Sequence, residues 1–243
     1  SYVALGDLKS TIETQQQRIQ LAQRVDSGLG QAISAYSIMA TMLTRSGRID
    51  AAKEALAAAE KLVTNAPPRV PKPIKDNWTA QLQRVRGLLA VATGRPAEGE
   101  AAAREALALV TQVLPMANNL GIPVDVMSNF RDWLLIDLGT ALARQNRMVE
   151  AEAEIRRSLL FRLERNGRYA SGTAIDVISL SGVLFEQGRY AESEKLADAA
   201  RETLEGLGHG KGSSALASAR SLMARAQAAQ GKVQEQRATY AAL

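Results

Sequence analysis

The sequence of 243 residues contains no cysteine, which excludes disulfide bonds, thiolate metal sites and cysteine nucleophiles. The absence fits both the cytoplasm and the periplasm. Histidine occurs once, as His209 in the loop-like segment GLGHGKGS, so a histidine-based metal site or a Ser-His-Asp triad is not expected. We expect His209 to be solvated or to cap a turn. We therefore predict no cofactor, no bound metal and no enzyme activity.

Aromatic residues are also scarce, at 4%, although 46% of the chain is hydrophobic and alanine supplies much of that fraction. This composition favours closely packed helices over a β-rich core. No uninterrupted apolar run approaches the roughly 18 residues of a membrane span, so none is predicted. The 30 Lys and Arg and 25 Asp and Glu residues are interspersed along the chain. That pattern is typical of a mildly basic surface and argues against a nucleic-acid partner.

One stretch, residues 173–208, shows the unit from which most of the chain is built. Before Gly188, apolar residues recur at intervals of three and four, which predicts an amphipathic helix, and a second helix follows from Tyr190. Glycine at the turn suits the left-handed backbone that ends many helices. Copies of this unit align on the turn residues Gly47, Gly94, Asn146, Gly188 and Gly231.

Small residues flank each turn at fixed distances. One stands seven residues before the turn, and in four copies another stands five residues after it. The pairs are Ala40 and Ala52, Gly87 and Gly99, Gly139 and Ala151, Ser181 and Ser193, while the last copy has Ala224 and Gln236. Small side chains at these points let the paired helices approach closely. A single pair cannot bury all its apolar surface, so the pairs are expected to stack.

This pattern resembles the tetratricopeptide repeat (TPR) family, whose helix–turn–helix unit carries small residues on both sides of the turn. Successive turn residues are 47, 52, 42 and 43 positions apart, longer than the roughly 34 residues of the basic repeat. The last two spacings resemble the longer-helix variety of kinesin light chains and of many bacterial multidomain proteins. The resemblance implies an all-α, right-handed superhelix (solenoid) of about five repeats with an extra N-terminal helix.

We predict a single repeat domain over residues 1–243. The N-terminal helix is expected over residues 7–25, with Ala22 or Val25 at the end of its apolar side. The expected repeats cover residues 28–65, 74–114, 123–166, 170–207 and 212–243. A proline-rich segment, 65–73, and a loop, 115–123, separate the first three repeats. No polar capping helix follows the last repeat, so we expect that the natural chain continues or that this end docks on a partner.

First-helix side chains line the concave surface of TPR proteins, and the resemblance places residues at five offsets before each turn on that surface. In the first repeat these are Ser34, Ser37, Thr41, Thr44 and Arg45. The partner-binding groove is expected to contain Arg84, Leu88, Trp133, Ile136, Thr140, Arg144, Ile178, Phe185 and Arg225. Its aromatic and isoleucine side chains form an apolar patch that suits an amphipathic helix or an extended apolar segment. The alternative is that the longer helices fold these side chains into the stack.

The sequence thus favours a non-catalytic scaffold that binds a protein or peptide segment. Candidate partners include another domain of the same polypeptide. The alternative is a regulatory or sensor segment of a larger bacterial enzyme, because repeats of this variety resemble those preceding CHAT peptidase, kinase or cyclase domains. A further set of arginines follows the third turn, and we expect it on a solvated helix surface, the alternative being a site for an acidic partner. The set is Arg156, Arg157, Arg162, Arg165 and Arg168.

Overall fold

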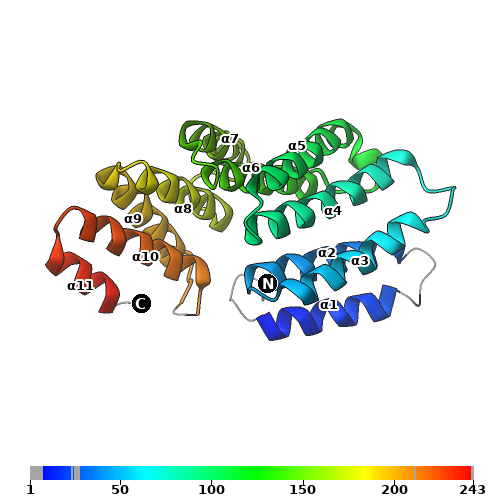
Figure 1. The fold of residues 1–243 in the computed structure, drawn as a ribbon, viewed down its shortest axis with the longest axis horizontal. Coiled ribbons are helices and arrows are strands. Elements are labelled where there is room, and N and C mark those ends of the chain that lie inside the picture. The colour runs from blue at the N-terminus through cyan, green and yellow to red at the C-terminus, as the bar shows by residue number, and fades with distance from the viewer. Residues whose placement is uncertain (1–7, 23, 25–27, 211, 242–243) are drawn as a thin grey trace. The chain divides into compact units, whose positions relative to one another are not determined.

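The computed structural model describes residues 8–22, 24, 28–210 and 212–241 (Figure 1). Within these ranges the chain forms eleven α-helices, two short 3-10 helices and no β-strand. The predicted all-α fold class is therefore confirmed. Val25, one of the two expected ends of the first helix, lies outside the described residues. The chain divides after Gln145 into two compact units, which we call the first unit and the second unit.

The helices follow one another as pairs joined by tight turns. The first unit contains α1 (Leu8–Ala22), α2 (Leu29–Arg45), α3 (Ile49–Thr64), α4 (Lys72–Ala92), α5 (Pro96–Val113) and α6 (Val124–Ala143), with η2 (Leu114–Met116) and η3 (Asn118–Leu120) between the last two. The second unit contains α7 (Met148–Asn166), α8 (Ser171–Glu186), α9 (Tyr190–Gly206), α10 (Ser214–Ala229) and α11 (Val233–Ala241). No helix in the described part of the chain is long and apolar enough to cross a membrane.

All five predicted turn residues adopt a left-handed backbone. Their φ angles are 76° at Gly47, 79° at Gly94, 61° at Asn146, 78° at Gly188 and 74° at Gly231. After Gly188, the backbone N–H of Arg189 donates to the carbonyl of Leu184 at 2.9 Å, the bond expected where a left-handed residue ends a helix. Each second helix begins two residues after its turn residue.

The small residues on either side of the turns allow close helix contact, as predicted. A Cβ atom on Gly99 would lie 2.5 Å from Cγ2 of Val91 and 3.1 Å from the carbonyl oxygen of Gly87, so α4 and α5 approach so closely that a larger residue here would force Val91 and the adjoining backbone to shift. In the second unit, the hydroxyl of Ser181 donates to the carbonyl of Ser193 at 2.8 Å, and both residues are fully buried.

Apolar side chains fill the space between successive pairs as well as within them. In the first unit, Leu56 and Val85 belong to a cluster shared by α2, α3 and α4, and α1 packs against α2 beside it. Val110 and Leu134 belong to a second cluster shared by α4, α5 and α6. In the second unit, Leu204 is fully buried in a cluster shared by α8, α9 and α10. The stacking of successive pairs therefore buries apolar surface that a single pair would leave exposed.

One helix starts earlier than expected. α4 begins at Lys72, two residues before the expected start of the second repeat. Pro73 falls in its first turn, where a backbone N–H has no acceptor within the helix, so the proline does not delay the start.

Candidate functional site

The first unit presents an exposed aromatic side chain at one of the predicted groove positions. Trp133 of α6 is 46% exposed. The Cζ atom of Arg84, from α4, lies 5.1 Å from the centroid of its ring. Nε of Arg84 also donates to Oδ2 of Asp137 at 2.6 Å, and these two side chains are 10% and 11% exposed. The ion pair holds the arginine against the ring.

Other predicted residues lie on the same side of α6. Residues 133, 137, 140 and 144 are spaced by four, three and four, which places them on one face of the helix. Thr140 and Arg144 are exposed, whereas Ile136 and, on α4, Leu88 are half-buried. We use the name α4–α6 face for Arg84, Leu88, Trp133, Ile136, Thr140 and Arg144.

Arg45 at the end of α2 adds a further positive charge near the Arg84–Asp137 pair. Partial loss of hydration lowers the pKa of the Arg45 guanidinium, and Arg84 acts in the same direction while Asp137 opposes both. Ser34 of α2 donates to Oε1 of Gln81 of α4 at 3.0 Å. The first helices of two successive repeats are thus joined by polar contacts on this side.

The remaining expected positions of the first repeat are not accessible. Ser37, Thr41 and Thr44 are each only 6% exposed. Their hydroxyls donate to carbonyls four residues earlier in α2, at distances between 2.8 and 2.9 Å. The prediction that these three line a groove is wrong, because α2 turns that side toward the hydrophobic core.

The second unit places an arginine over Phe185 in a similar way. Phe185 of α8 is half-buried, and Cζ of Arg225, from α10, lies 4.3 Å from its ring centroid. Nη2 of Arg225 lies 3.3 Å from Oε1 of Glu186. The ring centroids of Phe185 and Tyr190 are 5.3 Å apart, with the planes tilted by 58°. Phe185 is therefore more covered than Trp133.

Ile178 is half-buried and packs against the cluster of α8, α9 and α10. It offers a partner only the part of its side chain outside that cluster. Trp133 and Ile136 belong to the first unit, whereas Ile178 and Phe185 belong to the second. A single patch made by all four side chains stays a prediction.

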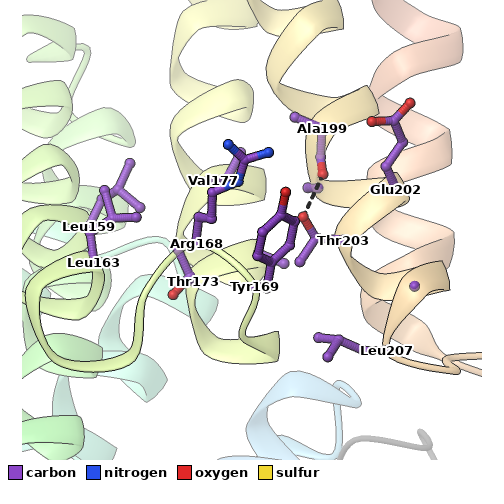
Figure 2. Close-up of a pocket in the computed structure, with 13 residues that line it drawn as sticks. Leu159, Leu163, Arg168, Tyr169, Thr173, Val177, Ala199, Glu202, Thr203 and Leu207 are labelled. Atoms are coloured by element: carbon purple, nitrogen blue, oxygen red, sulfur yellow. Dashed lines mark hydrogen bonds between the residues drawn. The ribbon is translucent and has the colours of Figure 1, made fainter.

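The second unit also contains a cavity that the sequence analysis did not identify. It has a volume of about 480 Å³ and lies between α7, α8 and α9 (Figure 2). Leu163 of α7, Val177 of α8 and Ala199 of α9 line it, together with Arg168 and Tyr169 from the loop between α7 and α8. The only feature of the sequence that points to this region is Tyr169, an aromatic residue in the four-residue loop between α7 and α8. One aromatic residue in a loop does not predict a cavity.

The arginines after the third turn occupy different environments. Arg162 is 4% exposed, and its Nε lies 2.9 Å from Oδ2 of the fully buried Asp176. Ser158 donates to the same oxygen at 2.8 Å. The expectation of a solvated surface is wrong for Arg162, because it faces α8. Arg168, in contrast, is exposed.

His209 joins two helix starts. Its Nε2 lies 2.9 Å from the hydroxyl of Ser171 at the start of α8, and its Nδ1 lies 3.1 Å from the hydroxyl of Ser213. Ser213 in turn accepts from the backbone N–H of Leu216 and caps α10. Within the described residues, no group of three or more His, Asp or Glu side chains is placed to hold a metal ion.

No family model and no curated protein sequence matches the chain. Several solved structures are similar. BtubC (BKLC) from P. vanneervenii has a TM-score of 0.64 and 14% identity, with 96% of this chain and 88% of that protein covered. The apo form of RapI has a TM-score of 0.60 and 13% identity, with 86% and 67% covered.

A putative kinesin light chain from Podosopora anserina, described as having nearly identical TPR-like repeats, has a TM-score of 0.55 and 15% identity. The match covers 86% of this chain and 91% of that one. The TM-scores establish a shared fold, and at identities this low a shared fold does not imply a shared partner. The left-handed turns, the small-residue contacts and the stacked pairs agree with these similarities, and the chain has a TPR-type helical repeat fold.

Proposed function

We propose that the protein is a non-catalytic scaffold that binds a protein or peptide segment on the α4–α6 face. The observation that carries this proposal is Trp133, a large ring that is 46% exposed while Arg84 holds it in place. Tryptophan and arginine are enriched among the residues that dominate binding energy at protein interfaces. Because Arg84 is already fixed by Asp137, binding requires little further ordering of these side chains.

The surroundings of the ring support an apolar or amphipathic partner segment. Leu88 and Ile136 supply half-buried apolar surface, whereas Thr140 and Arg144 are exposed and polar. An apolar centre with a polar rim is the usual arrangement of protein interfaces. The TPR-type fold adds support, since stacked helix pairs present extended surfaces to partners. Ile178, Phe185 and Arg225 are proposed as a second contact region, in the second unit.

A phage-displayed library of random 12-residue peptides tests the proposal. Peptides selected on the wild-type protein are synthesised with a fluorescent label, and their affinities are measured by fluorescence anisotropy. We expect the selected peptides to share a large apolar residue. We expect Trp133→Ala to weaken their binding at least about tenfold, as the loss of an anchor residue does.

Tyr240→Ala is the matched control, because Tyr240 is an aromatic residue of α11 that is 45% exposed, almost the same fraction as Trp133. It should leave peptide binding unchanged. Trp133→Ala should keep nearly the wild-type melting temperature, because the side chain is exposed. A library without binders, or binders with equal affinity for the wild type and Trp133→Ala, contradicts the proposal.

A further inference from the structure

The cavity of the second unit has apolar walls on three sides. Leu159 and Leu163 line it from α7, Val177 from α8, and Ala199 from α9. Leu163 is 37% exposed and Leu207, at the end of α9, is 45% exposed, so the walls remain accessible from outside. A volume of about 480 Å³ lies within the range of sites that bury a small organic molecule.

The two threonine hydroxyls that line the cavity already have acceptors within the protein. Thr173 donates to the carbonyl of Gly167 at 2.8 Å, and Thr203 donates to the carbonyl of Ala199 at 2.9 Å (Figure 2). They offer a ligand no free hydrogen. The polar groups that remain for recognition are the guanidinium of Arg168, the hydroxyl of Tyr169 and the carboxylate of Glu202.

Arg168 stacks on Tyr169, with its Cζ 4.4 Å from the ring centroid. Among the residues that the structure describes, no carboxylate forms an ion pair with Arg168. Figure 2 shows Arg168 on the side of the α7 leucines and Glu202 on α9, on the other side of Tyr169. Glu202 lies 3.6 Å from Nη2 of Arg201. The two edges of the cavity therefore carry opposite charges, and within the described residues Glu202, unlike Arg168, has an oppositely charged side chain beside it.

From this arrangement we propose that the cavity binds a small amphipathic anion. The apolar body of the ligand lies against Leu163, Val177 and Ala199, and its carboxylate, sulfonate or phosphate group pairs with Arg168. Glu202 repels an anion at the opposite edge and so sets the direction in which the ligand enters. The site lies on different helices from the α4–α6 face, and the inference is independent of the proposed function.

A pair of fluorescent probes that differ in one charged group tests this inference. The probes are 1-anilinonaphthalene-8-sulfonate (ANS) and N-phenyl-1-naphthylamine (NPN), which has the same aromatic body without the sulfonate. Both are titrated into the wild-type protein under direct excitation of the probe. We expect ANS to bind at least about tenfold more tightly than NPN, because a sulfonate accepts charge-assisted hydrogen bonds from a guanidinium.

Three variants locate the binding. Arg168→Gln should weaken ANS binding about five- to tenfold and leave NPN binding unchanged, since it removes the charge and keeps much of the side-chain stem. Arg157→Gln is the matched control, because Arg157 also lies over an aromatic ring, Phe161, at 5.8 Å but does not line the cavity. Ala199→Trp places a large side chain in the cavity from an exposed position on α9 and should abolish binding of both probes.

If Ala199→Trp does not unfold cooperatively, Leu163→Trp is tested in its place. It fills the cavity from α7, on the opposite wall. Several outcomes overturn the inference: no ANS binding to the wild-type protein, equal affinities for ANS and NPN, unchanged ANS binding in Arg168→Gln, or unchanged ANS binding in a folded cavity-filling variant. A loss of ANS affinity in Arg157→Gln equal to that in Arg168→Gln overturns it as well.

Discussion

The side-chain Nε2 of Gln187 donates to Oε2 of Glu152 at 2.9 Å and so ties the end of α8 to α7. The same contact recurs in two other places: Gln145 with Glu100 at 2.8 Å, and Gln230 with Glu194 at 2.8 Å. Each glutamine directly precedes a turn residue, and each glutamate stands six residues after the preceding turn residue. One polar contact thus repeats with the period of the helix pairs and holds neighbouring pairs in register.

We expect Glu152→Ala to lower the free energy of unfolding. The Glu152 side chain is 16% exposed and accepts from Gln187, Arg156 and Arg189. Removal of a partly buried, charged acceptor costs about 1–2 kcal/mol. Urea unfolding followed by circular dichroism measures the change. Glu105→Ala, at an exposed carboxylate of α5, is the control and should unfold as the wild type does. A wild-type unfolding curve for Glu152→Ala contradicts the prediction.

The stability should depend on pH through Glu152 and Glu194. Burial raises the pKa of Glu152, but hydrogen bonds from Gln187, Arg156 and Arg189 outweigh burial, and the pKa is lowered. For Glu194, burial is likewise outweighed, by hydrogen bonds from Lys232, Gln230 and Gln227. A folded-state pKa below the unfolded value of about 4.3 means that each carboxylate stabilises the fold above that pH. This stabilisation is lost as the pH falls through the folded-state pKa.

The measurement compares the wild type with the double variant Glu152→Gln/Glu194→Gln by urea unfolding between neutral pH and pH 3. The difference in unfolding free energy should be largest near neutral pH and should shrink as the pH falls from the unfolded-state value of about 4.3 toward the lower folded-state pKa values, because the wild-type carboxylates become protonated over that range. A difference that stays constant over the whole range rules out this linkage.

Two helical glycines should respond in opposite directions to replacement by alanine. Gly99→Ala brings a Cβ to 2.5 Å from Cγ2 of Val91, and the resulting overpacking costs about 1–3 kcal/mol. At Gly182 of α8, no described atom other than those of its chain neighbours and its own helix backbone lies within 4 Å of the Cβ position, so Gly182→Ala gains about 0.5–1 kcal/mol from reduced backbone entropy of the unfolded chain. Thermal unfolding should show a lower melting temperature for the first and a higher one for the second. Shifts of the same sign disagree with this packing.

The Arg84–Asp137 pair should behave as a coupled unit. Asp137→Ala leaves a largely buried guanidinium without its carboxylate and should cost about 2–4 kcal/mol. Replacement of both residues, as Arg84→Met/Asp137→Ala, should cost less than the sum of the single changes Arg84→Met and Asp137→Ala, because no buried charge is then left unpaired. A double-mutant cycle in urea measures the coupling. Additive single and double effects would refute it.

The accessible residues of the candidate site were predicted only in part. The offsets from the turns found Trp133 and Arg84, which contact each other, and Phe185 and Arg225, which do the same in the second unit. The same offsets failed in α2, where Thr41 is buried. One offset rule treats all first helices as if they had the same rotation about their axes. Each helix is in fact rotated by the side chains that it meets in neighbouring helices.

The sequence by itself determined the all-α class and the five turn residues on which the repeats align, including Asn146. These are local properties, because a left-handed backbone depends on the turn residue and amphipathic periodicity depends on one helix at a time. Only the tertiary structure decided that Arg162 is buried against Asp176 while Arg168 stays exposed, and that α7, α8 and α9 line an open cavity. Burial depends on how neighbouring pairs pack, and intervals along a single helix do not encode that packing.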